Sequence, residues 1–545
     1  MMQSYLRANI VMEPLVAQWY AWAHLIPPAT AARNITERHL RIMDSYITNP
    51  EAHAAAARNP KLLGGPFMDF GGNRTADVER LRERTRTECR HLIALSEAIE
   101  KLDELLREKA TGHSLDSLYA LIPGPLRGYV ELVYDLNHRA SFRLLEPLLY
   151  RSKYYEPSLQ AVTLSPIHAD DRPFVLSTPR FQTPDSVDLQ VPFSHPGLDA
   201  LHRMKTAPGD PQELEEMLGV GREAREVFQS FFTPEAPPAY ERYTGDGARW
   251  RYFGHACILL ETRSTSILFD PVLSYTYESR ISRYTYQDLP SSIDYVIITH
   301  NHQDHILFET LLQLRHRIGT VIVPRSGGGS LEDPSLKLLL HQCGFRKVIE
   351  LDDMEELPLG EGSITAIPFF GEHGDLNVRS KAAYVVRVNG QALMFAADSR
   401  NICPDLYAHI QREVGDIDIL FLGMECDGAP VSWIYGPLFT KRIQHQMDQS
   451  RRLAGSDCAQ GLDLVERFHC REVYVYAMGQ EPWLNYVMSI KYTEQSNPII
   501  QSNRLIQTCR ERGICAERLF GEKEILLAKR RSPKALVASG GARGE

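Results

Sequence analysis

Cysteines are few in this sequence, and their arrangement excludes two common uses of the residue. Nine cysteines are scattered through 545 residues. No CxxC pair occurs and the number is odd, which argues against a zinc knuckle and against a disulfide framework. We therefore expect a reducing compartment, the cytoplasm.

Long apolar runs and a basic excess are also missing. No stretch approaches the ~20 uninterrupted apolar residues of a transmembrane helix. The apolar segment 15–28 is interrupted by Gln18 and His24, so we expect a folded amphipathic segment rather than an export signal. The net charge is −9. Neither a membrane nor a nucleic acid is an expected partner.

The chain is too long for one ordinary domain, and its composition changes along its length. Residues 1–232 are expected to form one unit, with helices over 80–110 and 213–232. The proline-rich segment 233–239 predicts a linker. Residues 240–528 alternate short strands and helices, as in a layered α/β domain. The basic and then Ser/Gly/Ala-rich segment 529–545 predicts a disordered tail.

One motif carries most of the chemical information. Residues 300–305 read His-Asn-His-Gln-Asp-His. They directly follow the apolar, β-branched segment 295–299, which predicts a buried strand, and precede a helical pattern over 306–314. Ligands collect where strands of an α/β sheet end. The motif therefore lies where a binding site is expected.

The residue types in this motif favour a two-metal site. Imidazole and carboxylate together suit Zn, Fe or Mn rather than Ca or Mg. His300 and His302, spaced by two, can bind one metal, and the adjacent Asp304 and His305 can face a second. The HxHxDH pattern resembles the metallo-β-lactamase superfamily. That resemblance implies a fold and a metal site, but not one chemistry.

A bridging carboxylate is expected at Asp398. The predicted strand 392–396 runs directly into Ala397-Asp398, and in the superfamily pattern an Asp after this strand bridges the two metals. A helix N-cap is the structural alternative.

The remaining ligand of the first metal is either Glu372 or His373. Glu372 would give two imidazoles and one carboxylate, the arrangement of non-haem Fe(II) sites that activate oxygen. His373 would give three imidazoles, which suit zinc and hydrolysis. Neighbouring residues on an extended backbone point to opposite sides, so only one is expected to face the metals. We favour Glu372 and expect His373 to form a hydrogen bond beside the site.

Zinc hydrolases of this fold usually end their site with a histidine after the last core strand. Here no histidine follows the strand predicted at 473–478. Three weaker candidates for positions beside the ligands are His255, Glu425 and Asp427. A structural hydrogen bond is an equal alternative for His255, and either acid is an alternative late ligand. No substrate-binding residue is indicated.

The sequence differs from the zinc hydrolases of the fold in having Glu372 and in lacking the final histidine. In both respects it resembles the di-iron β-hydroxylases of chloramphenicol biosynthesis and related non-ribosomal peptide pathways. The matching positions are His300, His302, Asp304, His305, Glu372 and Asp398. The resemblance implies a metallo-β-lactamase αββα sandwich preceded by a mixed α/β N-terminal domain. That domain would support homodimerisation and docking on the synthetase.

The resemblance also implies the activity. We expect an oxygen-dependent di-iron monooxygenase that hydroxylates the β-carbon of an amino acid held as a thioester on a carrier domain. It would need two iron ions, dioxygen and an external donor such as a reductase or ferredoxin. The alternative is a zinc- or manganese-dependent hydrolase of a lactone, phosphodiester or thioester. A third hypothesis is a docking protein without catalytic activity.

Overall fold

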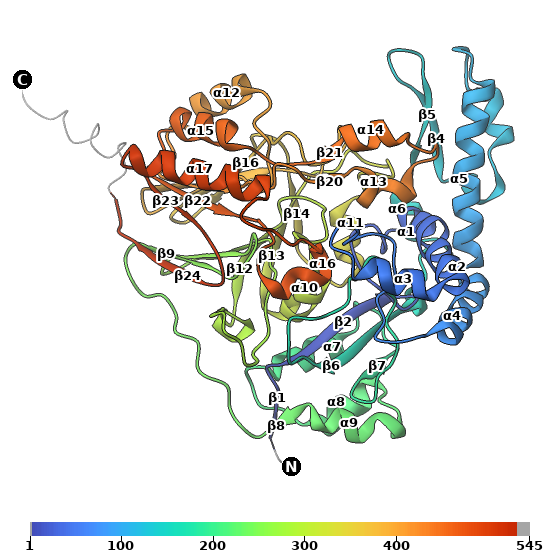
Figure 1. Cartoon of the computed structure of the whole chain (residues 1–545), viewed down its shortest axis with the longest axis horizontal. Helices are drawn as coiled ribbons and strands as arrows, with labels where there is room; N and C mark the ends of the chain where they lie inside the picture. The colour runs from blue at the N-terminus through green and yellow to red at the C-terminus, as the bar shows by residue number, and fades with distance from the viewer. Residues whose placement is uncertain (1–2, 531–545) are drawn as a thin grey trace, which may run out of the picture.

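The computed structural model describes residues 3–530, and two seven-stranded sheets organise its C-terminal half (Figure 1). The first sheet has the order β14 (Val348–Leu351), β13 (Ile318–Pro324), β12 (Ile293–Ile297), β11 (Ser266–Phe269), β10 (Ile258–Glu261), β9 (Ala248–Tyr252) and β24 (Lys523–Leu527). The second has the order β15 (Glu356–Leu359), β16 (Gly362–Ile367), β17 (Ala383–Val388), β18 (Gln391–Phe395), β19 (Ile419–Gly423), β22 (Glu472–Tyr476) and β23 (Cys515–Arg518).

Strand periodicity explains why both faces of the first sheet are buried. Successive side chains of a strand point to opposite faces. In β12, Ile297 joins the core between the two sheets, whereas Val296 joins the core on the outer face. The inter-sheet core includes Phe269 stacked on Phe395, with ring centroids 3.8 Å apart.

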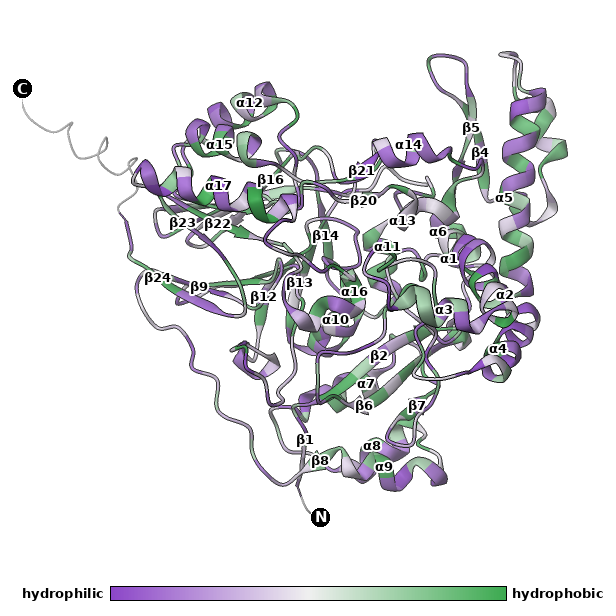
Figure 2. Cartoon of the chain, viewed as in Figure 1, coloured by the Kyte–Doolittle hydropathy of each residue, from purple (hydrophilic) through white to green (hydrophobic). Residues whose placement is uncertain are grey.

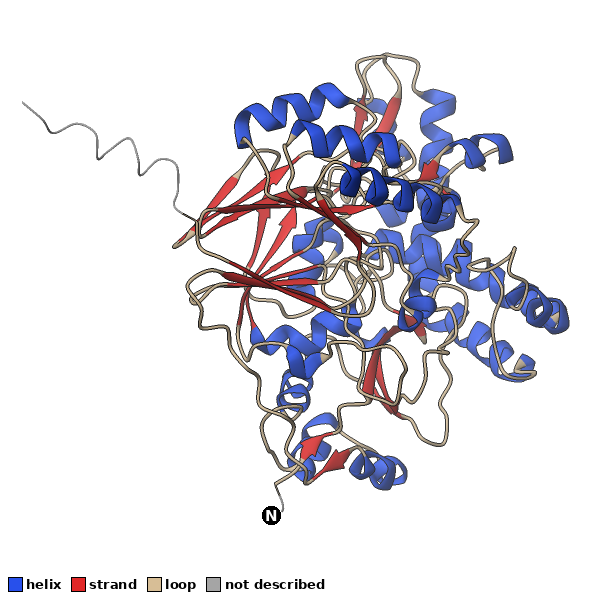
Figure 3. Cartoon of the chain, turned by 60° about the vertical axis from the view of Figure 1, so that its left-hand side comes forward, coloured by secondary structure: helices blue, strands red, loops and turns tan. Residues whose placement is uncertain are grey.

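Helices cover the outer face of each sheet, which completes the predicted αββα sandwich. α10 (Phe308–Leu314) and α11 (Leu336–Gln342) lie beside the first sheet, and α12 (Pro404–Val414), α15 (Cys458–Arg467) and α17 (Asn497–Glu511) lie beside the second. Figure 3 shows the two sheets as stacked layers. Hydrophobic and hydrophilic residues alternate along α17, as a helix with one buried face requires (Figure 2).

The N-terminal half is a mixed α/β domain, as predicted. Its central sheet has the order β3 (Trp19–Tyr20), β2 (Ile10–Val16), β6 (Gln160–Pro166) and β7 (Val187–Leu189). Around it lie α1 (Pro28–Asn34), α2 (Arg41–Thr48), α3 (Pro50–Ala57), α4 (Thr75–Glu88), α5 (Arg90–Lys109), α6 (Glu146–Leu149), α7 (Pro196–Arg203), α8 (Pro211–Leu218) and α9 (Arg225–Ser230). A hairpin joins β4 (Val130–Tyr134) to β5 (Ala140–Leu144), and β1 (Tyr5–Leu6) pairs with β8 (Phe232–Thr233).

The two halves share one hydrophobic core. Met12 of β2 and Leu201 of α7 belong to the same cluster as Leu311 of α10 and Val321 of β13. Between the halves, α10 contacts both β2 and α7. The N-terminal domain is therefore packed onto the outer face of the first sheet.

Four sequence expectations about elements need correction or qualification. The helix predicted over 80–110 is two helices, because the backbone leaves the helical region at Cys89. The helix predicted over 213–232 ends at Gly219, which adopts the left-handed conformation that terminates helices. The segment 15–28 is buried rather than amphipathic. Residues 531–545, most of the predicted tail, lie outside the described residues.

Candidate metal centre

The HxHxDH residues form a tight turn between β12 and α10. The backbone N–H of His305 donates to the carbonyl of His302 at 3.0 Å, and the three histidines are 0–3% exposed. His300 also forms a β-bridge with Lys381, which links the turn to the segment that precedes β17. The predicted strand, turn and helix are all present. The motif therefore lies at the carboxyl end of β12, an inner strand of the first sheet, as expected.

One group of ligand atoms comes from His300, His302 and Glu372. Their ligand atoms lie within 4.8 Å of one another. Glu372 Oε1 is 3.0 Å from His302 Nδ1. Glu372 has a φ of +65°, a conformation that non-glycine residues adopt at a cost of order 1–3 kcal/mol. The loop backbone is therefore turned so that this carboxylate faces the two imidazoles.

His373 lies beside this group without joining it. Its ring stacks on that of His302, with centroids 4.4 Å apart, and neither ring nitrogen has a hydrogen-bond partner among the described residues. The backbone at Glu372 is not extended, so the argument that neighbouring side chains of an extended segment point to opposite sides does not apply here. The expected hydrogen bond of His373 is replaced by ring stacking.

Asp398 lies between the two halves of the motif. Its Oδ2 atom is 3.0 Å from His305 Nε2 and 4.0 Å from His300 Nε2. A Cβ atom at Gly423, at the end of β19, would lie 2.4 Å from Asp398 Oδ1, so only glycine leaves room for this carboxylate. The carboxylate is therefore close to histidines of both predicted metal positions, and its bridging role stays a prediction.

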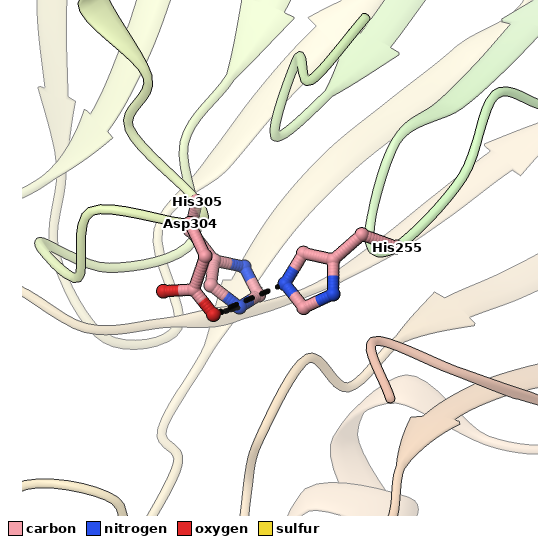
Figure 4. A group of neighbouring side chains, drawn as sticks. All are labelled: His255, Asp304 and His305. Atoms are coloured by element: carbon pink, nitrogen blue, oxygen red, sulfur yellow. Dashed lines mark ion pairs between the residues drawn. The ribbon is translucent and has the colours of Figure 1, made fainter. Parts of the chain in front are cut away.

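A second group consists of His255, Asp304 and His305 (Figure 4). His255 comes from the turn after β9, and its Nε2 atom is 3.2 Å from Asp304 Oδ2. Figure 4 shows the imidazole pointing toward the other two side chains. The sequence left only Asp304, His305 and Asp398 for a second metal. The geometry adds His255, which is completely buried.

Two further residues, whose roles beside the ligands the sequence did not predict, hold the imidazoles in place. Asp270 follows β11, and its Oδ2 atom is 2.8 Å from His305 Nδ1 and accepts from Thr299 Oγ1 at 2.6 Å. Tyr435 of α13 (Ser432–Tyr435) places its hydroxyl 3.2 Å from His302 Nε2. A carboxylate on the far nitrogen of a ligating histidine fixes the tautomer and the ring orientation.

The electrostatics of the site call for cations. Burial lowers the pKa of His302 to about 3, so the imidazole is neutral and able to ligate. Burial and the carboxylates of Asp398 and Asp304 raise the pKa of Glu372. His300 Nε2 and Asp398 Oδ1 are buried with no hydrogen-bond partner among the described residues. These donor atoms fit a pair of metal ions, which would satisfy them.

A cavity of about 310 Å³ opens onto the candidate ligands. Its lining includes His302, Asp304, Glu372 and Asp398. Glu425 also lines it but belongs to none of the metal-binding groups found among the described residues. Asp427, expected beside the ligands, is exposed and accepts from Asn497 Nδ2 at 2.8 Å, so it lies outside the site.

Two family models match the chain in succession. The model described as the diiron non-heme beta-hydroxylase N-terminal domain matches residues 5–237, and the beta-lactamase superfamily domain matches residues 265–430. The chain is also 41% identical over 535 residues to the 4-amino-L-phenylalanyl-[CmlP-peptidyl-carrier-protein] 3-hydroxylase of Streptomyces venezuelae, covering 96% of this chain and 100% of that enzyme. This chain belongs to the di-iron β-hydroxylase family.

Solved structures agree with this assignment. The crystal structure of CmlA, a diiron beta-hydroxylase from Streptomyces venezuelae, superposes with a TM-score of 0.91 at 40% identity, covering 96% of this chain and all of that one. A CmlA variant gives a TM-score of 0.89. By contrast, the UPF0173 protein of Pyrococcus abyssi is 30% identical over 22% of this chain and 48% of its own length.

Membership in the di-iron β-hydroxylase family decides between the alternatives drawn from the sequence. The protein is an oxidoreductase that uses a di-iron site and dioxygen, and the comparisons favour this activity over the hydrolase and the idle docking protein. In the described part of the chain, no helix is long and apolar enough to cross a bilayer.

Proposed function

We propose that this di-iron β-hydroxylase hydroxylates the β-carbon of an aminoacyl group held as a thioester on a carrier domain of a non-ribosomal peptide synthetase. The full-length similarity to an enzyme named for a carrier-bound aminoacyl substrate carries this proposal. The cavity that reaches the metal ligands supports it, because a substrate carbon must come close to them.

The shape of the space around the site supports a tethered substrate. A second cavity of about 490 Å³ shares Gly64, Pro430 and Trp433 with the cavity at the metals. Trp433 Nε1 donates to the Gly64 carbonyl at 2.8 Å where the two cavities meet. A carrier-bound group hangs from a long prosthetic arm. The two adjoining cavities offer such an arm a path between the domains.

We propose places for two iron ions on the basis of the ligand groups. His300, His302 and Glu372 would hold one iron, and Asp304 and His305, with His255, would hold the other. Asp398 would serve both. When bound, the iron pair supplies the electron-transfer chemistry with dioxygen that zinc, which has no accessible redox state, does not.

The protein's own groups position and shield this chemistry. Asp270 and Tyr435 hold His305 and His302 in orientation. Ile434, Leu453 and Met488 give the cavity apolar walls, which exclude water and strengthen the electrostatic interactions inside.

The balance of the reaction requires further partners. Inserting one atom of dioxygen into a C–H bond releases the other as water, which consumes two electrons and two protons. We therefore include an external reductase or ferredoxin-type donor in the proposal. We also propose a homodimer and a cytoplasmic location, as the family resemblance and the reduced cysteines suggest.

The test combines metal analysis with turnover. Protein from iron-sufficient medium should contain about two irons per chain. With a chemical reductant and dioxygen it should add one oxygen atom to an aminoacyl carrier domain, detected by mass spectrometry, and should turn over the free amino acid poorly. Equal rates on free and tethered amino acid, or full activity with stoichiometric zinc, would reject the proposal.

A further inference from the structure

Glu425 is a carboxylate in the metal-site cavity whose bonding is incomplete. It lies just after β19 and lines the cavity of about 310 Å³ together with the candidate metal ligands. Its Oε1 atom accepts from the backbone N–H of Gly428 at 2.8 Å. Its Oε2 atom is buried and has no hydrogen-bond partner among the described residues. A buried acceptor of this kind normally has a partner.

The cavity supplies no positive side chain to serve as that partner. Its described lining includes one histidine, His302, and four acids, of which Asp304, Glu372 and Asp398 are candidate metal ligands. Lysine and arginine are absent from this lining. Glu425 is thus the one acid in the lining that no metal group claims. No lysine or arginine of the described lining is available to pair with it, so a positive group brought by the substrate would find an unclaimed carboxylate here.

The energetic situation of Glu425 agrees with a cationic partner. Burial, together with the nearby carboxylates of Asp427 and Asp398, raises the pKa of Glu425 to about 7. A positive group in the cavity would stabilise the ionised form and complete its hydrogen bonds. A charge-assisted bond between ammonium and carboxylate is stronger than one between neutral groups.

We propose that Glu425 receives the α-ammonium group of the carrier-bound aminoacyl substrate. The inference rests on the proposed function, because an aminoacyl thioester carries a free α-amine one carbon away from the β-carbon. Fixing that amine beside the ligand cluster orients the β-carbon toward the metals. The apolar and aromatic remainder of the lining, which includes Trp433, Ile434 and Tyr492, then takes the amino-acid side chain. Glu425 selects α-amino acids over neutral acyl groups.

The experiment pairs a charge change in the enzyme with one in the substrate. Carrier domains are loaded with phenylalanyl, tyrosyl and 4-aminophenylalanyl groups, and with the matching α-hydroxy acyl groups in which a neutral hydroxyl replaces the ammonium. Wild type should favour the α-amino substrate in kcat/KM by roughly 10- to 100-fold, the range for a bond to a charged group. Glu425→Gln should lose most of this preference through KM while keeping about two irons per chain.

The neighbouring acid provides the matched control. Asp427 is exposed and bonded to Asn497, so Asp427→Asn should keep the wild-type preference. The inference is overturned if Glu425→Gln retains the preference, if it loses iron and so acts as a metal ligand, or if Asp427→Asn has the same effect.

Binding measured separately distinguishes this inference from the proposed function. The affinity of the reduced, oxygen-free enzyme for the α-amino and α-hydroxy carriers is followed by fluorescence anisotropy of a labelled carrier. If wild type discriminates in binding but hydroxylates no carrier, Glu425 keeps its role and the proposed function fails. If wild type hydroxylates carriers without any preference that depends on Glu425, the proposed function stands and the inference fails.

Discussion

Glu372 Oε1 lies 3.0 Å from Nδ1 of His302, whereas the ring of the next residue, His373, stacks on the same imidazole. One side chain therefore presents an oxygen to the space that His302 faces, and the other presents a ring plane. This difference separates a two-histidine, one-carboxylate site from a three-histidine site. The first suits oxygen-activating iron and the second suits hydrolytic zinc.

Substitution of Glu372 should lower the metal content, whereas substitution of His373 should leave it unchanged. Glu372→Ala should lose iron from the first group, because it removes the only carboxylate of that set. His373→Ala should keep about two irons, with activity reduced by roughly 10- to 100-fold, the range for residues that contact ligands. Metal analysis by mass spectrometry measures the iron content of both variants. If His373→Ala strips the iron while Glu372→Ala keeps it, the assignment is reversed.

His255 should contribute to the second iron. The imidazole is buried beside Asp304 and His305, so His255→Ala should lower the iron content toward one per chain or weaken the second binding step in an iron titration. His469→Ala is the control, because His469 is 68% exposed at its side chain and pairs with Asp416 instead. An unchanged second binding step in His255→Ala would limit His255 to a packing role.

Asp270 should act through His305. Asp270→Asn keeps the size of the side chain but replaces the negative acceptor 2.8 Å from His305 Nδ1. We expect metal affinity to fall roughly 10- to 100-fold, with the fold retained as judged by circular dichroism. Measured iron dissociation constants equal to those of wild type would contradict this role.

Glu309 should stabilise the junction of the two halves. It is 1% exposed, lies on α10, and accepts from Arg172 Nη1 at 3.0 Å and from the hydroxyls of Tyr20 and Tyr275 at 2.9 and 2.8 Å. Glu309→Ala leaves a buried arginine short of a partner, which costs about 3–5 kcal/mol. Chemical denaturation of the variant and of wild type measures this decrease in the free energy of unfolding.

An exposed ion pair serves as the control for Glu309. Glu131 pairs with Arg143 in the β4–β5 hairpin, and both side chains are about half exposed. Glu131→Ala should change the free energy of unfolding by less than about 1 kcal/mol. Equal decreases in the free energy of unfolding of the two variants would show that the buried network stabilises the fold no more than an exposed ion pair does.

The sequence was most informative where the chemistry is local in the chain. The strand, the HxHxDH turn and the following helix are contiguous. Their hydrophobic periodicity and ligand spacing can therefore be recognised within one short segment of the sequence. Asp398 was found in the same way, because it directly follows a buried strand. The order of such elements predicted a layered α/β domain, and the family resemblance implied the αββα sandwich.

What the sequence did not reveal depends on contacts between distant segments. From the sequence, His255 was only a weaker candidate beside the ligands, because it lies 45 or more residues before the motif, on the turn between β9 and β10. Asp270 looks like an ordinary residue after a strand until the parallel pairing of β11 with β12 places it under His305. Glu372 was favoured from the sequence as a ligand, but its left-handed backbone was not predicted, because glutamate has no propensity for that conformation. The prediction of one helix over 213–232 did not take into account that Gly219 could terminate it.

The hydrophobic core shared by β2, α7 and α10 restricts how this enzyme can be recombined. A chimaera that takes residues 1–232 from a relative, in order to change the carrier partner, would place the relative's residue in the position of Arg172 opposite this chain's own α10, and would pack unmatched side chains against the first sheet. Partner exchange by cutting at the linker therefore has to transplant α10 and its buried glutamate as well. Evolution of new carrier partners is then expected to proceed by surface substitution rather than by swapping modules.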